Sequence, residues 1–499
     1  MSADQLTPII AQGHNCWRIA RATHASVIVD AADYYRIIAA AMEAAQQRIF
    51  IVGWDFDTRI ALSPDEHGKG ETLGRFFLRL AKDKPERQID ILKWNFGALK
   101  QFFRPAATVW LARWWKTKAI DFRFDSSHPP GCSHHQKIVV IDDSLAVCGG
   151  IDISTARWDT SDHLDDDPRR TGPDGKPYAP WHDATMLMRG DVAGVLGELG
   201  RERWKIATRA DLKPIDSCDD DWPADLEPMF RDVDIAIART RAAYDTLPEV
   251  REIETLYLDM IAAAKRFIYF ENQYFTSAKI AAAIARRMAE DDPPEIVMVM
   301  PRTADGWLEQ KAMDASRLKV VAAIGKADPH NRFRVYVPVT KGGTDIYVHA
   351  KVSIVDDRLL RVGSSNLNNR SQGLDSECDV IIDAALAANR GSEAAMTALR
   401  HRLIAEHLAC PLEDVAAREQ ACGSMIEVIE ALRGSGKTLE LLEMEEIGEV
   451  QTFIAENEVL DPESPDEMFE PFGKHGMAHS WAKGRAMIGK RLGRGGSKS

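Results

Sequence analysis

Runs of apolar residues that favour strands alternate along the chain with segments that have the periodicity of helices. Ala39–Arg48 has a helical pattern and leads into an apolar run, Ile49–Trp54, that predicts a strand. The same order recurs later, where the helical pattern of Glu254–Lys265 precedes a predicted strand over Phe267–Phe270. Alternation of this kind is typical of α/β proteins, and we expect a fold of that class.

Two polar segments interrupt the alternation. Asp162–Pro180 is rich in Asp, Pro and Gly and predicts an inserted loop, and Cys218–Pro228 predicts a linker between two halves. Beyond about residue 410 the pattern is helical and acidic, and after Glu470 only basic residues carry charge. The last segment therefore predicts a flexible basic tail.

The chain contains an internal repeat, and each copy carries the motif H-x-K-x₄-D. The first copy, Ser133–Asp152, reads SHHQKIVVIDDSLAVCGGID, and the second, Tyr347–Asn366, reads YVHAKVSIVDDRLLRVGSSN. Aligned on the histidines, both copies place a glycine 14 residues later, Gly149 and Gly363, and a carboxylate or amide 17 residues later. One chance match to the motif is expected about 0.05 times in such a chain, so two matches indicate a duplicated half-domain.

The histidine and lysine of each motif are expected to act together. Because side chains alternate along a strand, His135 and Lys137 project from one face, as do His349 and Lys351. If the two halves pack with pseudo-twofold symmetry, two imidazoles and two ammonium groups meet in one cleft. One neutral histidine can act as a nucleophile and one protonated histidine as an acid, which fits cleavage of a phosphodiester through a covalent phosphohistidine.

Anion binding is expected from the groups around the histidines. Lys137, Lys351 and the amide of Asn366 form a receptor for a tetrahedral phosphate, and Asp152 occupies the place of Asn366 in the first half.

Four further carboxylates are expected to have supporting roles. Asp142 and Asp356, the last residues of the two motifs, close their strands and are expected to hold the local structure through hydrogen bonds. Asp183 is expected behind the histidine of the first motif and Glu377 behind that of the second, where each would fix the tautomer of its imidazole.

Other candidate residues leave two interpretations open. His134 and His182 either line the entrance to the site or are buried structural histidines, and the second interpretation is the more common one for a single histidine. Trp54, Trp94 and Trp181 either contact the substrate or pack in the core.

Composition excludes several classes of protein. The chain has 63 Lys and Arg against 76 Asp and Glu, and its net charge of −13 disfavours a dedicated nucleic-acid binder. No apolar run is long enough to span a membrane, and the N-terminal residues do not have the pattern of a secretory signal. The seven cysteines are scattered, which predicts a reducing compartment.

Metal ions and cofactors are not expected in the chemistry. No cluster of carboxylates, histidines or cysteines with the spacing of a metal site is visible in the sequence. The segment Gly434–Thr438 resembles a phosphate-binding loop, but Ala431 stands where that motif has glycine. We therefore expect no metal and no nucleotide.

The two motifs and their surroundings resemble the phospholipase D superfamily, in particular its phosphatidylcholine-hydrolysing branch of bacterial type. The similar segments are Gly53-Trp54, His134–Asp159, Trp181–Asp183, Tyr269–Phe275 and Val348–Glu377. The resemblance implies two pseudo-twofold-related α/β/α sandwich halves that share one central active site. It divides the chain into residues 1–225 with the first motif, residues 226–410 with the second, and an extension over residues 411–499.

The resemblance also implies an activity. A phospholipid would be hydrolysed to phosphatidic acid and a free head group, or its head group exchanged for another alcohol. By analogy the six motif residues form the catalytic set, with His135 as the nucleophile and His349 as the general acid. The polar insertion Asp167–Tyr178 and the Asp152–Asn366 difference leave the preferred head group open.

Three other functions remain as alternatives: a phosphatidyltransferase of the cardiolipin synthase type, a superfamily nuclease, and a scaffold that only binds anionic lipid. The net charge disfavours the nuclease, and two intact motifs disfavour the scaffold. We expect a monomer that meets phospholipid at a membrane surface and binds no nucleic acid. It is expected in the cytoplasm or peripherally on a membrane, with export by a route that reads no N-terminal signal as the alternative.

Overall fold

The computed structural model describes residues 7–95, 105–216, 222–303 and 307–442, and the segment predicted as a basic tail lies outside them. The first half contains strands β1 (Arg18–Val29), β2 (Arg48–Gly53), β3 (Gln88–Trp94), β4 (Ile120–Asp125), β5 (Ile138–Ile141), β6 (Leu145–Gly149), β7 (Trp181–His182) and β8 (Ala184–Arg189). Its helices are α1 (Ala31–Ala44), α2 (Leu73–Asp83), α4 (Pro105–Trp115) and α5 (Asp191–Thr208).

The second half repeats this pattern. Its strands are β9 (Phe230–Arg241), β10 (Val250–Arg251), β11 (Phe267–Glu271), β12 (Glu295–Val299), β13 (Phe333–Val339), β14 (Tyr347–Val348), β15 (Val352–Val355), β16 (Leu359–Gly363) and β17 (Glu377–Asp383). Its helices are α6 (Glu252–Ala263), α7 (Ala278–Met288), α8 (Trp307–Lys326) and α9 (Glu393–Leu408), with short helical turns η1 (Arg370–Leu374) and η2 (Ala387–Asn389).

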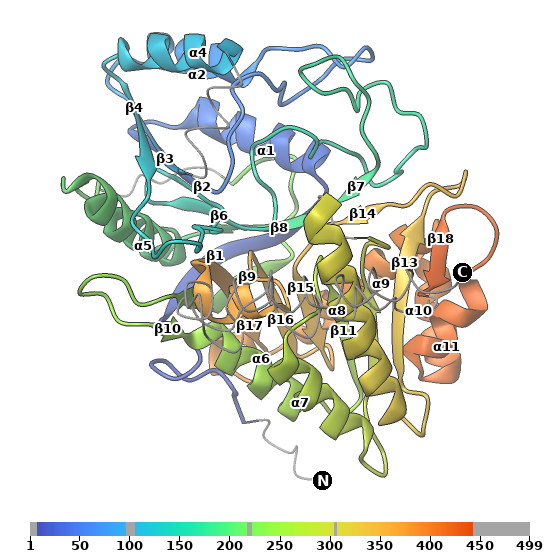
Figure 1. Ribbon diagram of the computed structural model, residues 1–499. Helices are drawn as coiled ribbons and strands as arrows, with labels where there is room; N and C mark the ends of the chain where they lie inside the picture. Colours follow the sequence, from blue (N-terminus) through green and yellow to red (C-terminus); the bar gives the residue numbers. More distant parts are fainter. Residues whose placement is uncertain (1–6, 96–104, 217–221, 304–306, 443–499) are drawn as a thin grey trace, which may run out of the picture.

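Helices cover both faces of the sheet in each half (Figure 1), which confirms the predicted α/β class. Strand β2 shows the cause in its alternating apolar residues: Ile49 and Ile51 pack with α1 and α2, whereas Phe50 and Val52 pack on the opposite face with α5. In the second half, β11 divides its side chains in the same way between α6 and α7 on one face and α9 on the other.

The two halves share one sheet. Of the described residues, sixteen strands join in it. The halves meet where β1 pairs antiparallel with β9, and the order from there is β8-β6-β5-β2-β3-β4 on one side and β17-β16-β15-β11-β12-β13 on the other. These orders correspond strand by strand, as a pseudo-twofold axis at the junction requires. A second, two-stranded sheet also crosses the junction, because β7 runs parallel to β14.

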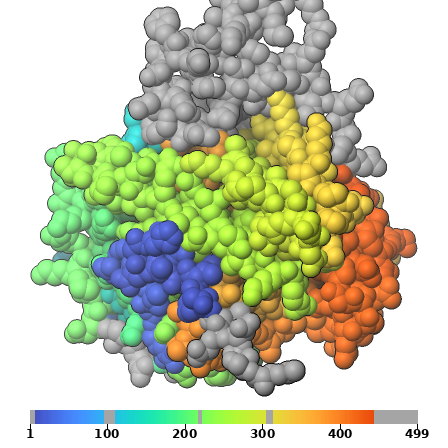
Figure 2. Space-filling model, turned by 90° about the horizontal axis from the view of Figure 1, so that it is seen from below, coloured from blue at the N-terminus to red at the C-terminus, as the bar shows by residue number. Residues whose placement is uncertain are grey.

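Residues before β1 and after α9 both pack on the second half. The backbone N–H of Ile9 donates to Asp383 at 2.8 Å, and Asn15 donates to Asp259 at 2.8 Å. Figure 2 shows this blue N-terminal segment lying against green and orange surface. After α9, helices α10 (Leu412–Cys422) and α11 (Met425–Leu432) lead to strand β18 (Thr438–Leu441), which pairs with β13 at the edge of the sheet.

The repeated glycines are required by close strand packing. A Cβ on Gly149, at the end of β6, would lie 2.6 Å from the Cβ of Thr185 in β8. A Cβ on Gly363, at the end of β16, would lie 2.6 Å from the Cα of Asp379 in β17. Both distances are shorter than any normal carbon–carbon contact, so each position accepts only glycine.

Gly363→Ala is therefore expected to lower the free energy of unfolding by about 1–3 kcal/mol, the usual cost of overpacking. Urea denaturation followed by tryptophan fluorescence measures the change. Gly325→Ala in α8 is the control, because no heavy atom lies within 4 Å of the added Cβ. The control should be unchanged, or more stable by up to about 1 kcal/mol, since alanine favours a helix. Equal losses in the two variants would contradict the packing explanation.

Candidate active site

The motif histidines lie at the junction between the halves, in the extended segments that enter β5 and β15. The backbone N–H of His135 donates to the carbonyl of Ser376 at 2.9 Å, and that of His349 donates to the carbonyl of His182 at 2.8 Å. Each motif is therefore hydrogen-bonded to the other half before its own strand begins.

These backbone hydrogen bonds between the halves also determine which carboxylate lies beside which histidine. His135 Nδ1 lies 3.0 Å and 3.1 Å from the two oxygens of Glu377, and His349 Nδ1 lies 2.7 Å from Asp183. The prediction that each carboxylate serves the histidine of its own half is wrong. The parallel pairing of β7 with β14 places Asp183 beside His349. The β-bridge between His134 and Ser376 places Glu377 beside His135.

Both carboxylates are fully buried and held by further donors. The hydroxyls of Ser364 and Ser371 donate to Glu377 at 2.5 Å and 2.7 Å, and the N–H of Ala184 donates to Asp183 at 2.8 Å. Burial raises the pKa of Glu377 to about 8 and that of Asp183 to about 6. With each Nδ1 occupied by a carboxylate, Nε2 is the ring atom that is left to react.

The surroundings of both motif imidazoles favour their neutral forms. Burial lowers the pKa of His135 well below its usual range, and Lys137 and Lys351 lower it further. Burial lowers the pKa of His349 in the same way, assisted first by Lys351 and then by Arg157. An anion bound beside these cations would offset their effect and allow one imidazole to hold a proton.

The two lysines have different partners. Lys137 Nζ lies 2.9 Å from the carbonyl of His135 and 3.3 Å from Asp152. Lys351 instead donates to the amide oxygen of Gln273 at 3.2 Å and to the carbonyl of its own motif histidine. Burial lowers the pKa of Lys351 to about 7. Lys137 thus has a carboxylate counter-ion, whereas Lys351 faces neutral amides.

Asn366 lies beside the second lysine, as Asp152 lies beside the first. Its side-chain N–H₂ reaches Gln273 at 3.5 Å, and its Oδ1 is buried without a hydrogen-bond partner among the described residues. The predicted anion receptor is therefore brought together, and Gln273 is an addition that the spacing of the motifs did not indicate.

Asp142 and Asp356 are remote from the reacting atoms. Each accepts hydrogen bonds from three consecutive backbone N–H groups at the start of the neighbouring strand, and both have positive φ angles, 49° and 54°. They therefore fix the strand ends, which is the local role that the sequence indicated. The donors are Gln46, Gln47 and Arg48 for the first and Lys265, Arg266 and Phe267 for the second.

Aromatic side chains lie beside both histidines. The ring of Trp54 meets that of His135 edge-on at 5.9 Å and stacks on Trp94. Trp181 lies 5.1 Å from the ring of His349, and its indole Nε1 is buried without a hydrogen-bond partner in the described part of the chain. The two motif imidazoles expose 14% and 6% of their side chains, so the neighbouring aromatic rings restrict access to them.

His134 and His182 are both buried. His134 is buried between Ser376, 2.6 Å from its Nδ1, and Asp125, 3.2 Å from its Nε2. His182 is fully buried, and its Nε2 lies 2.9 Å from Glu271. The interpretation as buried structural histidines is therefore the correct one for both residues.

Comparisons with known proteins agree with this geometry. A family model described as Phospholipase D matches residues 41–282, and one described as Cardiolipin synthase, PLD-like domain, matches residues 257–396. Phospholipase D1 of Saccharomyces cerevisiae is 26% identical over 382 residues, covering 56% of this chain and 22% of that protein. Phospholipase D A of Dictyostelium discoideum is 25% identical over 444 residues, covering 72% of this chain and 32% of that protein.

The chain spans a third or less of the length of these two relatives. Among solved structures, phosphatidylserine synthase of Haemophilus influenzae superposes with a TM-score of 0.52 and 12% identity, covering 75% of this chain and 86% of that one. This likeness concerns the fold. No helix of the described residues is long and apolar enough to cross a membrane.

The titration of Lys351 should be visible in the pH profile. Since its pKa is lowered to about 7, it is charged below this pH and neutral above it, and kcat/KM toward a phosphodiester should fall as the pH rises through 7. Gln273→Glu places a carboxylate beside the ammonium, which raises its pKa, so the alkaline limb should move upward by about one pH unit.

Gln88→Glu, the same change at an exposed position of β3, is the control and should leave the limb in place. If the alkaline limb of the pH profile does not move in Gln273→Glu, a group other than Lys351 determines that limb.

Proposed function

Because the chain belongs to the phospholipase D superfamily, we propose that it is a phospholipase D, which hydrolyses the distal phosphodiester of phospholipids such as phosphatidylcholine to phosphatidic acid and a free head group. The observation that carries the proposal is the exchange of partners at the junction. Two imidazoles, each backed by a buried carboxylate of the other half, lie with two lysines in one site.

In the first step, Nε2 of His135 attacks the phosphorus. In its ionised form, Glu377 accepts the Nδ1–H of this ring and so keeps the lone pair on Nε2. The bond between phosphorus and the head-group oxygen breaks, and the imidazolium of His349 gives its Nε2 proton to that oxygen. Lys137 and Lys351 neutralise the equatorial oxygens of the transition state.

In the second step, the phosphohistidine is released. Neutral His349 now removes a proton from water, whose oxygen attacks the phosphorus as the bond to His135 breaks. Phosphatidic acid leaves, and both histidines return to their first protonation states. An alcohol in place of water gives a phosphatidyl alcohol, so transfer between head groups is expected from the same site.

The protonation of His349 depends on the substrate. Without a ligand, burial and the lysines lower the pKa of both catalytic imidazoles, which favours their neutral forms. A bound phosphodiester brings one negative charge to the lysines, which raises the pKa of the neighbouring ring. Asp183, at 2.7 Å, stabilises the resulting imidazolium. We therefore expect His349 to gain its proton when the substrate binds.

A phosphatidyltransferase is the second candidate, because the model that matches residues 257–396 is described as a cardiolipin synthase domain. It would use the same two histidines with a lipid alcohol as the acceptor. A nuclease is disfavoured by the net charge of −13.

We propose that the protein acts as a monomer at the surface of a phospholipid membrane, from the cytoplasm and without a cofactor in the chemical step.

Product analysis tests the class of reaction. Vesicles of phosphatidylcholine and phosphatidylglycerol with added ethanol should yield phosphatidic acid, choline and phosphatidylethanol, whereas single-stranded DNA should stay intact. Cardiolipin as the main product would favour the transferase, and cleaved DNA the nuclease.

His135→Asn and His349→Asn should each reduce turnover by at least about 10⁴-fold, with the double variant scarcely worse, because the two rings act as a unit.

The exchanged partners lead to opposite effects for the two carboxylates. Asp183→Asn weakens the general acid, so hydrolysis of a lipid with an alkoxide leaving group should fall by about 10²–10⁴-fold. A p-nitrophenyl phosphodiester, whose leaving group needs little protonation, should be much less affected. Glu377→Gln weakens the nucleophile and should slow both substrates equally. The reverse pattern would make His349 the nucleophile.

A further inference from the structure

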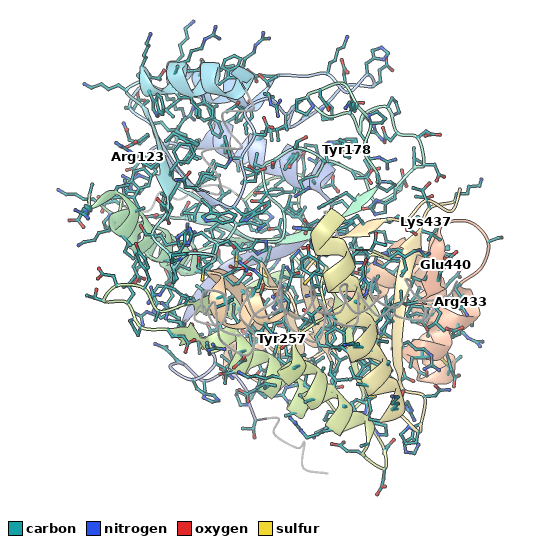
Figure 3. The ribbon with its side chains drawn as sticks, in the orientation of Figure 1. Arg123, Tyr178, Tyr257, Arg433, Lys437 and Glu440 are labelled. Carbon is teal, nitrogen blue, oxygen red and sulfur yellow. The ribbon has the colours of Figure 1, made fainter. Side chains whose placement is uncertain are left out.

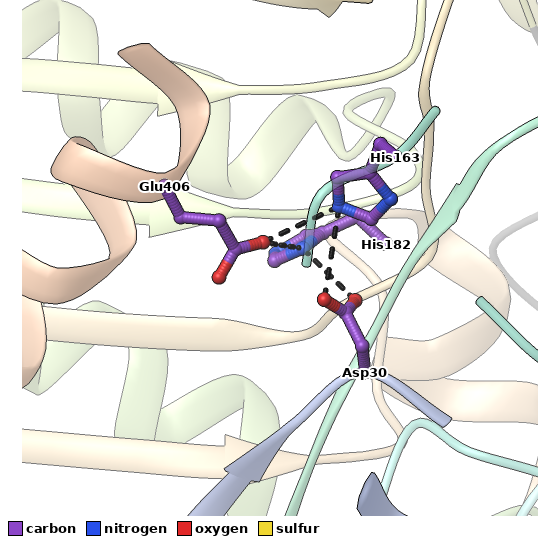
Figure 4. A group of neighbouring side chains, drawn as sticks. All are labelled: Asp30, His163, His182 and Glu406. Atoms are coloured by element: carbon purple, nitrogen blue, oxygen red, sulfur yellow. Dashed lines mark hydrogen bonds and ion pairs between the residues drawn. The ribbon is translucent and has the colours of Figure 1, made fainter. Parts of the chain in front are cut away.

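A second cluster of titratable groups lies buried behind the pair formed by His349 and Asp183. Asp30 follows β1, His163 lies in the inserted loop, His182 belongs to β7, and Glu406 comes from α9 of the second half. Figure 4 shows the four side chains pointing toward a common centre. The mechanism above uses none of them.

We propose that these four residues bind one divalent cation of the zinc class. His182 Nδ1 lies 3.0 Å from Glu406 and 3.3 Å from Asp30, and His163 Nε2 lies 3.3 Å and 3.7 Å from the same two carboxylates. Zinc holds nitrogen and oxygen ligands at about 2.0–2.2 Å, so neighbouring ligands of a tetrahedral site are about 3.3–3.6 Å apart. Two of the four observed spacings fall within this range, and the other two, 3.0 Å and 3.7 Å, lie within about 0.3 Å of it.

The far nitrogens of both imidazoles are oriented as in zinc sites. His163 Nδ1 lies 2.9 Å from Asp159, and His182 Nε2 lies 2.9 Å from Glu271. A histidine that ligates a metal commonly donates its other N–H to a carboxylate, which fixes the tautomer and directs the lone pair at the ion. Both rings have this arrangement, with the lone-pair nitrogen facing the centre of the cluster.

The near nitrogen of His182 supplies an independent indication. This Nδ1 is fully buried and makes no hydrogen bond in the described part of the chain, although two carboxylate oxygens lie within 3.3 Å of it. A lone pair that faces two anionic oxygens is repelled unless a cation lies between them. Two neutral imidazoles and two carboxylates around a divalent cation form a neutral set, which suits a buried place.

The ion would stabilise the junction rather than take part in the reaction. Four protein ligands leave no open position, which is typical of structural zinc sites. Three ligands come from the first half and Glu406 from the second. Asp30 also forms two hydrogen bonds with Asp183. Its backbone N–H donates to the carbonyl of Asp183 at 2.7 Å, and its side-chain Oδ1 accepts from the backbone N–H of Asp183 at 3.2 Å. The ion would therefore also position the carboxylate that supports His349.

The competing arrangement has no metal and places a second proton on each imidazole. Lys437, from the segment before β18 and labelled in Figure 3, is half-buried close by and donates to the carbonyl of Ser161. Ser161 in turn donates to Asp30 at 2.7 Å. In this arrangement imidazolium ions and the lysine neutralise the carboxylates, and the cluster is only an ion-pair network.

Metal analysis separates the two arrangements without reference to activity. The full-length protein, purified without a metal-affinity tag and dialysed, should contain about one zinc per chain. Removal with dipicolinate should lower the thermal midpoint, and zinc should restore it better than calcium. Cobalt(II) added to the stripped wild-type protein should give the intense visible absorption of a tetrahedral site, a test that does not depend on any variant folding.

His163→Ala and Glu406→Gln should lose the bound metal and the cobalt absorption. His401→Ala is the matched control, because this histidine lies in α9 but contacts Glu419 instead, and it should keep both. The proposal is overturned if the wild-type protein holds less than a tenth of an equivalent of metal and added zinc or cobalt changes neither the midpoint nor the spectrum. Retention of the metal by both ligand variants would overturn it equally.

Discussion

The hydrogen bond between each motif imidazole and a carboxylate of the opposite half is the interaction on which the arrangement of the site depends. His135 with Glu377 and His349 with Asp183 are formed only when β1 pairs with β9 and β7 pairs with β14. Burial of these carboxylates is unfavourable by itself, and it is tolerated because each accepts several hydrogen bonds. The two imidazole–carboxylate pairs of the site therefore form only when the junction between the halves is folded.

The pseudo-twofold symmetry is broken beside the two motif lysines. Lys137 faces the carboxylate of Asp152, whereas Lys351 faces the amides of Gln273 and Asn366. Burial lowers the pKa of Lys351 to about 7, although the nearby carboxylate of Asp183 acts in the opposite direction. A duplicated unit has thus diverged in the residues beside its lysines while the motifs themselves stayed the same.

Much of this site was predictable from the sequence, because the motifs are local. The spacing of the motif residues along the chain determines on which side of a strand the histidine and lysine side chains lie. Both repeated glycines lie where neighbouring strands leave no room for a side chain. The pairing of Asp183 and Glu377 was not predictable, because a twofold axis allows each carboxylate to serve either half. The cluster of Asp30, His163, His182 and Glu406 was hidden for a related reason, since its members are separated by most of the chain.

The crossing of Asp183 and Glu377 has a consequence for the origin of the molecule. A polypeptide with only one half would carry a histidine and a lysine, yet its carboxylate would extend into solvent with no imidazole to meet. Two identical copies, associated about the axis that now relates the halves, would complete both pairs at once. A chain with a single motif would therefore complete this site only as a homodimer, and the duplicated chain makes within one polypeptide the contact that such a dimer would make between subunits.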